Sequence, residues 1–156
     1  GSLVTPGYYK NLAATAEVRE FGWHHTGDIG VMDEEGFVHI VDRKKDMIIT
    51  GGFNVFPNEV EQILSQHPAV QDCAVFGVPD EKWGEAVKGV VQLKRDAEVT
   101  PQELIALVKE KLGSVKSPKS IDFMNQLPRS PVGKVLKTEL RKPYWAEINS
   151  VATYKK

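Results

Sequence analysis

Two regions of this chain meet in one segment, Asp42-Arg43-Lys44-Lys45-Asp46-Met47-Ile48-Ile49-Thr50-Gly51-Gly52. A cluster of charged residues passes directly into an apolar run that favours a strand, and a glycine pair follows. This order predicts an exposed joint, then a short buried strand, then a tight turn. We therefore expect a structural boundary at this segment.

Before this boundary, residues 1–41 lack the pattern of a self-sufficient core. A short helix is predicted around residues 13–19. A turn at Asp33-Glu34-Glu35-Gly36 joins residues 29–32 to residues 37–41 as a hairpin. Because a two-stranded hairpin is only marginally stable alone, we expect this region to pack on another structure.

After Met47, strands and helices alternate, which predicts a compact α+β domain. The best-marked helix begins with the capping box Thr100-Pro101-Gln102-Glu103 and ends at Gly113. The expected helices are residues 57–64, residues 101–112 with Leu104, Leu107, Val108 and Leu112 buried, and a terminal helix capped by Thr138. The expected strands are residues 70–78, 86–93 and 121–124, and a loop covers residues 127–133.

The composition is that of an ordinary globular protein. The chain has 156 residues, 41% hydrophobic and 26% charged, with 20 basic against 21 acidic side chains. This balance argues against a polyanion-binding surface, so nucleic acid is not an expected partner. The single cysteine, Cys73, lies in an apolar run and is expected to be a buried, inert thiol. A reducing, cytoplasmic location fits, and no segment has the length of a transmembrane span.

Three segments carry a resemblance to a known family. They are, in order, Gly22-Trp23-His24-His25-Thr26-Gly27-Asp28, Gly51-Gly52-Phe53-Asn54-Val55-Phe56-Pro57-Asn58-Glu59-Val60-Glu61 and Leu127-Pro128-Arg129-Ser130-Pro131-Val132-Gly133-Lys134. Together they resemble the C-terminal portion of the adenylate-forming (AMP-binding) superfamily, in its acyl-CoA and aryl-CoA synthetase branch. The resemblance implies that residues 1–42 are the distal end of a large N-terminal domain and residues 43–156 the C-terminal domain, with a hinge at residues 42–46.

The resemblance gives Asp28 and Arg43 a role in binding ATP or AMP. A carboxylate can accept hydrogen bonds from the vicinal hydroxyls of a ribose, and a guanidinium offers a rigid fork of donors to a ribose or a phosphate. From the residues alone, Asp28 is equally a turn-stabilising side chain and Arg43 a solvated surface charge.

Lys134 stands where the family has its catalytic lysine. A long stem can carry a compact positive charge into a closed site, where it would stabilise the negative charge shared by a carboxylate and an α-phosphate. Taken by itself, a loop lysine is usually a solvated charge. An exposed lysine is also open to acylation, which would remove this charge.

The resemblance assigns further roles along the chain. Lys45 matches the hinge residue about which the C-terminal domain rotates. Gly51 and Gly52, which are otherwise simply a turn, would line the channel for the pantetheine arm of CoA. Trp83 and Lys119 would approach CoA, the ring on pantetheine and the ammonium near the phosphates.

Two departures from the family concern the nucleotide of CoA. Val115 and Ser117 fall where some relatives have an aromatic residue and an arginine. How this chain would hold the CoA nucleotide therefore stays open. No metal site is expected, because His24-His25 lacks further ligands at a suitable spacing and Asp33-Glu34-Glu35 lacks the alternating oxygens of a calcium loop.

The sequence thus predicts the C-terminal part of an ATP-dependent carboxylic acid:CoA ligase, which forms an acyl-adenylate and then an acyl-CoA thioester after domain rotation. ATP, Mg²⁺ and CoA are the implied cofactor and substrates, with Mg²⁺ and the acid held mainly by the missing N-terminal domain. The fragment alone is expected to be inactive. Three alternatives stay open: an adenylation domain that loads a carrier protein, a luciferase-like oxidative enzyme, and a noncatalytic binding or regulatory module.

Overall fold

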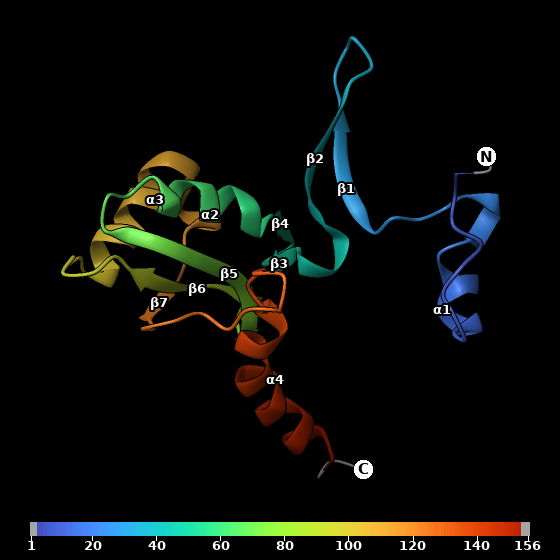
Figure 1. Ribbon diagram of the computed structural model, residues 1–156. Helices are drawn as coiled ribbons and strands as arrows, with labels where there is room; N and C mark the ends of the chain where they lie inside the picture. Colours follow the sequence, from blue (N-terminus) through green and yellow to red (C-terminus); the bar gives the residue numbers. More distant parts are fainter. Residues whose placement is uncertain (1–2, 154–156) are drawn as a thin grey trace. The chain divides into compact units, whose positions relative to one another are not determined.

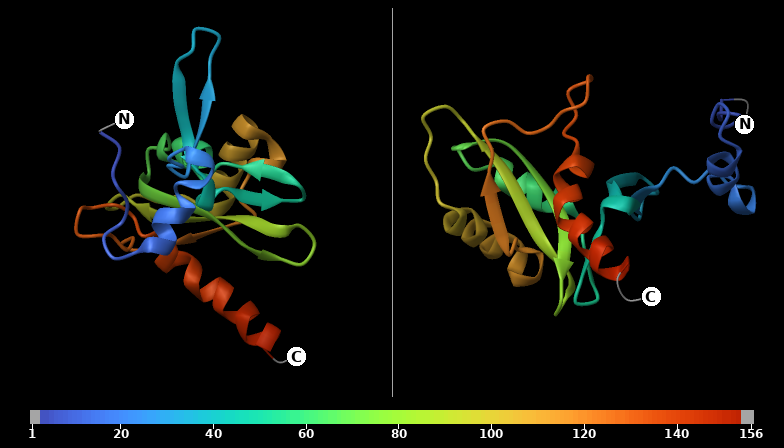
Figure 2. Two further views of the ribbon diagram at one scale, coloured as in Figure 1. Left: turned by 90° about the vertical axis from the view of Figure 1, so that its right-hand side faces the viewer. Right: turned by 90° about the horizontal axis from the view of Figure 1, so that it is seen from below.

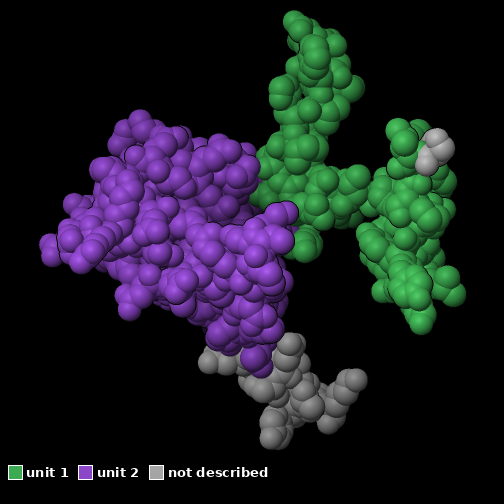
Figure 3. Space-filling view, in the orientation of Figure 1, with its two compact units in different colours: residues 1–45 green, residues 46–156 purple. Residues whose placement is uncertain are grey.

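The computed structural model describes residues 3–153, with the side chains of residues 3–146. The chain divides into two compact units, Gly1–Lys45 and Asp46–Lys156 (Figure 3). The division falls inside the charged segment in which the sequence predicts a boundary. That the two units belong to two different domains of a larger enzyme stays a prediction.

The first unit consists of a short helix and one hairpin. Helix α1 spans Leu12–Glu17 and the single turn η1 spans Glu20–Gly22. Strands β1 (Asp28–Met32) and β2 (Val38–Arg43) pair antiparallel, as the sequence predicts. None of the residues described in this unit is buried. The hairpin therefore offers its apolar side chains to solvent, as expected of a region that lacks its own core.

The second unit is built on a five-stranded mixed sheet in which β6 is the central strand (Figure 1). Strand β5 pairs antiparallel with β6, and β3 and the parallel strand β7 also pair with β6. The strands are β3 (Ile48–Thr50), β4 (Phe53–Val55), β5 (Val70–Asp80), β6 (Gly84–Leu93) and β7 (Ser120–Phe123). The turn η2 (Lys44–Asp46) precedes β3, and the helices are α2 (Pro57–Ser65), α3 (Pro101–Lys116) and α4 (Lys137–Thr153).

Alternate residues of β5 pack into two separate hydrophobic cores, because successive side chains of a strand point to opposite faces. Cys73 and Val75 pack with α2 and α3, whereas Ala74 and Phe76 pack with Leu140 of α4. Helices therefore cover both faces of the sheet (Figure 2). This explains why residues 73–78 are apolar without the polar alternation of a half-exposed strand.

The predicted α+β class is confirmed. The predicted burial of the Cys73 thiol and the predicted capping box at Thr100 are confirmed as well. The carboxylate of Glu103 accepts a hydrogen bond from the backbone N–H of Thr100, at 2.8 Å, and the Thr100 hydroxyl accepts from the Glu103 N–H, at 3.2 Å. Gly113 adopts φ +81°, which interrupts the helical geometry where the sequence predicts the end. Cys73 is 7% exposed, and burial raises its pKa to about 11.

Two details of the prediction are wrong. Helix α4 begins at Lys137, so Thr138 lies inside the first turn instead of capping it. The carbonyl of Leu136 accepts the first bonds of this helix, from the N–H groups of Glu139 and Leu140. In α3, Leu104 and Val108 are buried, but Leu107 and Leu112 are only half-buried.

Candidate functional site

Asp28 and Arg43 lie directly opposite each other on the hairpin of the first unit. Their side chains form an ion pair, with 2.7 Å between Oδ1 and Nη1. A carboxylate has a second oxygen, and a guanidinium carries five N–H donors, so the pair leaves polar groups of both residues for a ligand. The structure thus brings together the two residues predicted to bind ATP or AMP, at the open end of the exposed hairpin.

Lys45 lies in η2 and is exposed. It is the last residue of the first unit, and Asp46 begins the second. A residue that ends one compact unit can change its backbone angles without disturbing the packing within either unit. The location suits the predicted hinge, whose movement stays a prediction.

Gly51 and Gly52 form the tight turn between β3 and β4, with φ of +55° and +83°. The backbone N–H of Gly51 donates to the carbonyl of Trp83, at 2.8 Å. A Cβ atom on Gly51 would lie 2.7 Å from Cε3 of the Trp83 indole, whereas a Cβ atom on Gly52 would meet nothing within 4 Å. Gly51 is therefore required for both its conformation and its contact, and Gly52 for its conformation alone.

A cavity of about 200 Å³ opens beside this contact. The Nζ atom of Lys119 donates to the carbonyl of Ser114, at 3.2 Å, so the ammonium is held at the cavity wall. The predicted CoA-binding residues Gly51, Trp83 and Lys119 thus gather in one place, although they come from three separate connections. The lining residues are Thr50, Phe53, Trp83, Ser114, Val115 and Lys119.

The structure also explains one of the two departures from the family. Ser117 is 3% exposed, and its hydroxyl donates to the carbonyl of Ile105, at 3.1 Å. It therefore fastens the end of α3 and cannot replace an arginine that contacts a ligand. Lys82 is a nearby cation that the sequence analysis missed, with Nζ 4.6 Å from the centroid of the Trp83 ring. In the sequence, the sign of this cation is its place directly before Trp83.

Lys134 lies at the tip of a small hairpin between β7 and α4. Arg129 and Val135 pair antiparallel, and the N–H of Ser130 donates to the carbonyl of Lys134, at 2.8 Å. Gly133 turns the chain with φ +82°. The Lys134 side chain is exposed and makes no hydrogen bond or ion pair with another described residue. A shaped loop therefore presents an ammonium that is available to a ligand.

The two predicted sites of the second unit lie at opposite ends of the β5–β6 hairpin. Trp83 follows Asp80 at the turn between the strands, whereas the loop of Lys134 is attached near the other end, at Asp72. At the rise of a strand, Asp72 and Asp80 are on the order of 25 Å apart. The right-hand view of Figure 2 shows the orange loop before α4 and the β5–β6 turn far from each other.

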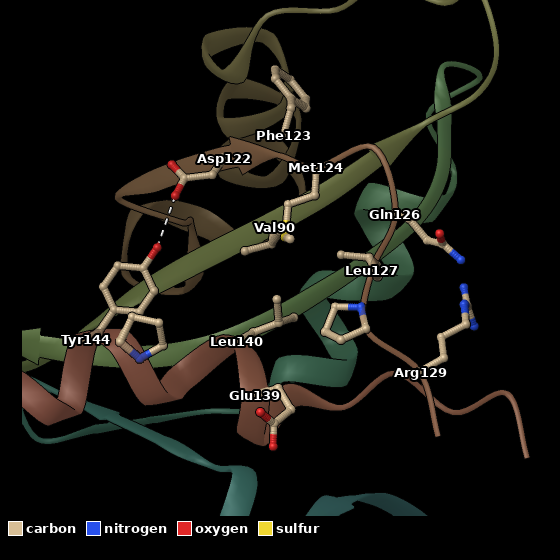
Figure 4. Close-up of a pocket in the computed structure, with 12 residues that line it drawn as sticks. Val90, Asp122, Phe123, Met124, Gln126, Leu127, Arg129, Glu139, Leu140 and Tyr144 are labelled. Atoms are coloured by element: carbon tan, nitrogen blue, oxygen red, sulfur yellow. Dashed lines mark hydrogen bonds between the residues drawn. The ribbon is translucent and has the colours of Figure 1, made fainter. Parts of the chain in front are cut away.

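A larger groove, about 690 Å³, lies between β6, β7 and the start of α4 (Figure 4). At one end Asp122 accepts a hydrogen bond from the Tyr144 hydroxyl, at 3.1 Å, and pairs with Lys88, at 2.8 Å. Lys88 is only 6% exposed. The hydrogen bond from Lys88 lowers the pKa of Asp122, so this carboxylate is ionised at neutral pH. The signal for this pair, which the sequence analysis missed, is a lysine inside an apolar strand.

The described part of the chain has neither a candidate metal site nor a helix that could span a membrane. It holds no group of His, Cys, Asp or Glu side chains arranged to bind a metal ion. No helix there has the length and apolar character to cross a membrane.

Comparisons with known proteins place this geometry in context. Residues 59–134 match the family described as the AMP-binding enzyme C-terminal domain. The chain is 47% identical over 152 residues to a long-chain-fatty-acid–CoA ligase of Escherichia coli O6:H1, with 97% of the chain and 27% of that protein covered. It is 45% identical to a feruloyl-CoA synthase of an Amycolatopsis species, with 92% of the chain and 29% of that protein covered.

Solved structures show the same likeness. ATP-bound MatB from Rhodopseudomonas palustris matches with a TM-score of 0.84 and 39% identity, over 92% of the chain and 29% of that protein. The chain therefore spans less than a third of the length of the relatives it matches.

Proposed function

Because this chain belongs to the adenylate-forming (AMP-binding) enzymes and carries their C-terminal domain, we propose that it forms the C-terminal part of an ATP-dependent carboxylic acid:CoA ligase. In the first half-reaction a carboxylate oxygen attacks the α-phosphorus of ATP and pyrophosphate leaves. In the second, the thiol sulfur of CoA attacks the acyl carbon and AMP leaves.

The observation that carries this proposal is the separation of Lys134 from the Gly51–Trp83 contact along β5. One end of the domain presents the Lys134 ammonium, which pairs with no other residue among those described and so suits the charge that builds up during adenylation. The other end presents an apolar cavity with a lysine at its wall, which fits a thin pantetheine chain that ends in phosphates. A domain with one function at each end must turn to offer them in succession to one active site, and Lys45 is the proposed pivot.

Asp28 and Arg43 would hold the ribose or α-phosphate of the nucleotide. Mg²⁺ would neutralise charge on the phosphates when bound. We assign Mg²⁺ and the acid-binding pocket to the rest of the enzyme, because this chain spans less than a third of the length of its relatives. A cytoplasmic location would supply the ATP and CoA that the proposed reaction consumes.

The decisive experiment compares Lys134→Ala with the unmodified full-length enzyme in the two half-reactions. Adenylation is measured from acid and ATP, and thioester formation from supplied acyl-adenylate and CoA. We expect adenylation to fall by about 100-fold or more, while thioester formation largely survives. The control is Lys109→Ala, which removes an exposed lysine of α3. Equal losses in both halves, or none in either, would contradict the proposal.

The relatives leave the acid open between fatty and aryl acids, since one is named for long-chain fatty acids and another for ferulate. A panel of both classes, assayed by acid-dependent pyrophosphate release, identifies it. Supplying either CoA or a phosphopantetheinyl carrier protein as acceptor tests the alternative of carrier loading. Transfer to the carrier alone would replace the CoA ligase assignment.

The exposed ammonium of Lys134 is also the proposed site of regulatory acylation, because an amide would remove the charge that adenylation uses. Mass spectrometry of the enzyme from its native cells should detect acyl-Lys134 under some growth condition. An unmodified Lys134 under every condition would contradict this role.

A further inference from the structure

The loop of Lys134 is anchored on one cross-strand pair of the sheet. Asp72 on β5 lies opposite Gln92 on β6, next to an irregularity of the strand pairing. The Gln92 side-chain oxygen accepts the N–H of Leu127, at 3.2 Å, and the Asp72 carboxylate pairs with the guanidinium of Arg129. Both side chains of the pair therefore hold the segment that leads into the loop.

Arg129 extends this attachment to the tip of the loop. Its Nη2 atom bonds the carboxylate of Asp72, and its Nη1 atom donates to the carbonyl of Gly133, at 2.7 Å. Gly133 is the residue immediately before Lys134. Because a guanidinium is a rigid planar fork, the two bonds tie the backbone beside Lys134 to a fixed point on β5.

The remaining bonds of the loop act within the loop itself. The N–H of Ser130 donates to the carbonyl of Lys134 and the N–H of Leu136 to the carbonyl of Pro128, both at 2.8 Å. These bonds determine the shape of the hairpin. The pair of Arg129 with Asp72 determines its direction relative to the sheet.

We propose that Arg129 is a positioning residue for Lys134, and that Asp72 orients Arg129. The inference rests on the proposed function, in which the Lys134 ammonium stabilises the charge of the adenylation step. Arg129 acts through the backbone of Gly133 and not on the substrate. Freed from this bond, the loop would present the ammonium in a range of positions, and a misplacement of about 1 Å costs up to ~100-fold in rate.

The test uses the full-length enzyme with Arg129→Lys, Lys134→Ala and the double variant. Lysine keeps the charge but replaces the fork with one ammonium, which cannot hold both acceptors in the same geometry. We expect Arg129→Lys to lower the adenylation rate by about 10- to 100-fold. The KM values for ATP and acid and the thioester half-reaction should not change. The matched control is Arg95→Lys, at an arginine whose side chain is 95% exposed in the same domain.

The double variant gives the discriminating result. If Arg129 acts only through Lys134, Arg129→Lys causes no further loss in the Lys134→Ala background. Independent losses that multiply would overturn the positioning role and leave the proposed function intact. Full adenylation by Lys134→Ala alone would instead overturn the proposed function, and with it the reason to position this lysine.

Asp72→Asn provides a second variant in case Arg129→Lys does not fold. Asparagine keeps an oxygen for the N–H of Cys73, which Asp72 binds at 2.8 Å, but loses the charge that orients Arg129. With an unchanged melting temperature, Asp72→Asn should lower adenylation in the presence of Lys134 and not in its absence. An unchanged adenylation rate in this folded variant would overturn the proposal.

Discussion

The indole ring of Trp83 occupies the space that a side chain on Gly51 would need, with 2.7 Å between Cε3 and an ideal Cβ position. The two residues are also joined through the backbone, since Gly51 N–H donates to the Trp83 carbonyl. The turn between β3 and β4 and the turn between β5 and β6 therefore form one wall beside the proposed pantetheine cavity.

Gly51→Ala should destabilise the domain more than Gly52→Ala. Both positions have positive φ, which costs a residue with a Cβ about 1–2 kcal/mol, but only Gly51 has no room for the methyl group. Urea denaturation of the two variants measures the difference, and a changed fluorescence of Trp83 should accompany Gly51→Ala. Equal losses of unfolding free energy would show that the ring moves aside freely.

Lys82→Gln and Lys119→Gln should each raise the KM for CoA by about tenfold, as expected for the loss of a hydrogen bond to a charged group. If these cations bind phosphates, the same substitutions leave the KM for pantetheine, which has none, unchanged. Lys109→Gln on the exposed side of α3 is the control. Equal effects on both thiols would point to a damaged cavity and not to a lost phosphate contact.

Asp122→Asn should destabilise the domain by about 1–3 kcal/mol, because the buried ammonium of Lys88 loses its charged acceptor. The double variant with Lys88→Met should recover most of this loss, since no buried charge then remains. Chemical denaturation of both single variants and the double variant measures the coupling. A double variant less stable than Asp122→Asn would contradict this account.

The lowered pKa of Asp122 predicts that the stability of the domain depends on pH in the acid range. The pKa of Asp122 is lowered from its usual 3.8, so its ionised form favours the folded state. This contribution is fully present above about pH 4 and is lost as the pH falls through the lowered native pKa. The stability gap between the unmodified protein and Asp122→Asn should therefore shrink in acid. A gap that is constant down to pH 2 would contradict the assignment.

Cys73 predicts a change in stability at alkaline pH. Burial raises its pKa from 9.0 to about 11, so the folded state disfavours the thiolate. Stability is unaffected below about pH 9 and falls as the pH rises from there towards 11, where the unfolded chain already carries the thiolate. Cys73→Ala should remove this slope. Iodoacetamide should label Cys73 slowly at pH 8 in the folded protein and rapidly in urea.

Local patterns were sufficient for most of the fold. The turn at Asp33, the capping box at Thr100 and the break at Gly113 each depend on residues close in sequence, so their chemistry is visible without coordinates. Thr138 failed as a cap because Leu136, part of the preceding loop, supplies the first carbonyl of α4. The first residue of α4 is therefore set by where the preceding loop ends, and not by the preference of Thr138 for a capping position.

The sequence by itself determined the α+β class and the boundary near Lys45, because periodicity and turn chemistry are properties of neighbouring residues. Its resemblance to the family supplied the candidate residues from Asp28 to Lys134. Only the tertiary structure decided which of them meet. Arg129 and Asp72 are 57 positions apart, Trp83 meets Gly51 beside the paired strands β3 and β6, and the buried Ser117 hydroxyl donates to a carbonyl of α3. Such contacts arise when strands and helices pack to bury their apolar faces, and this packing brings together polar groups whose positions in the sequence are unrelated.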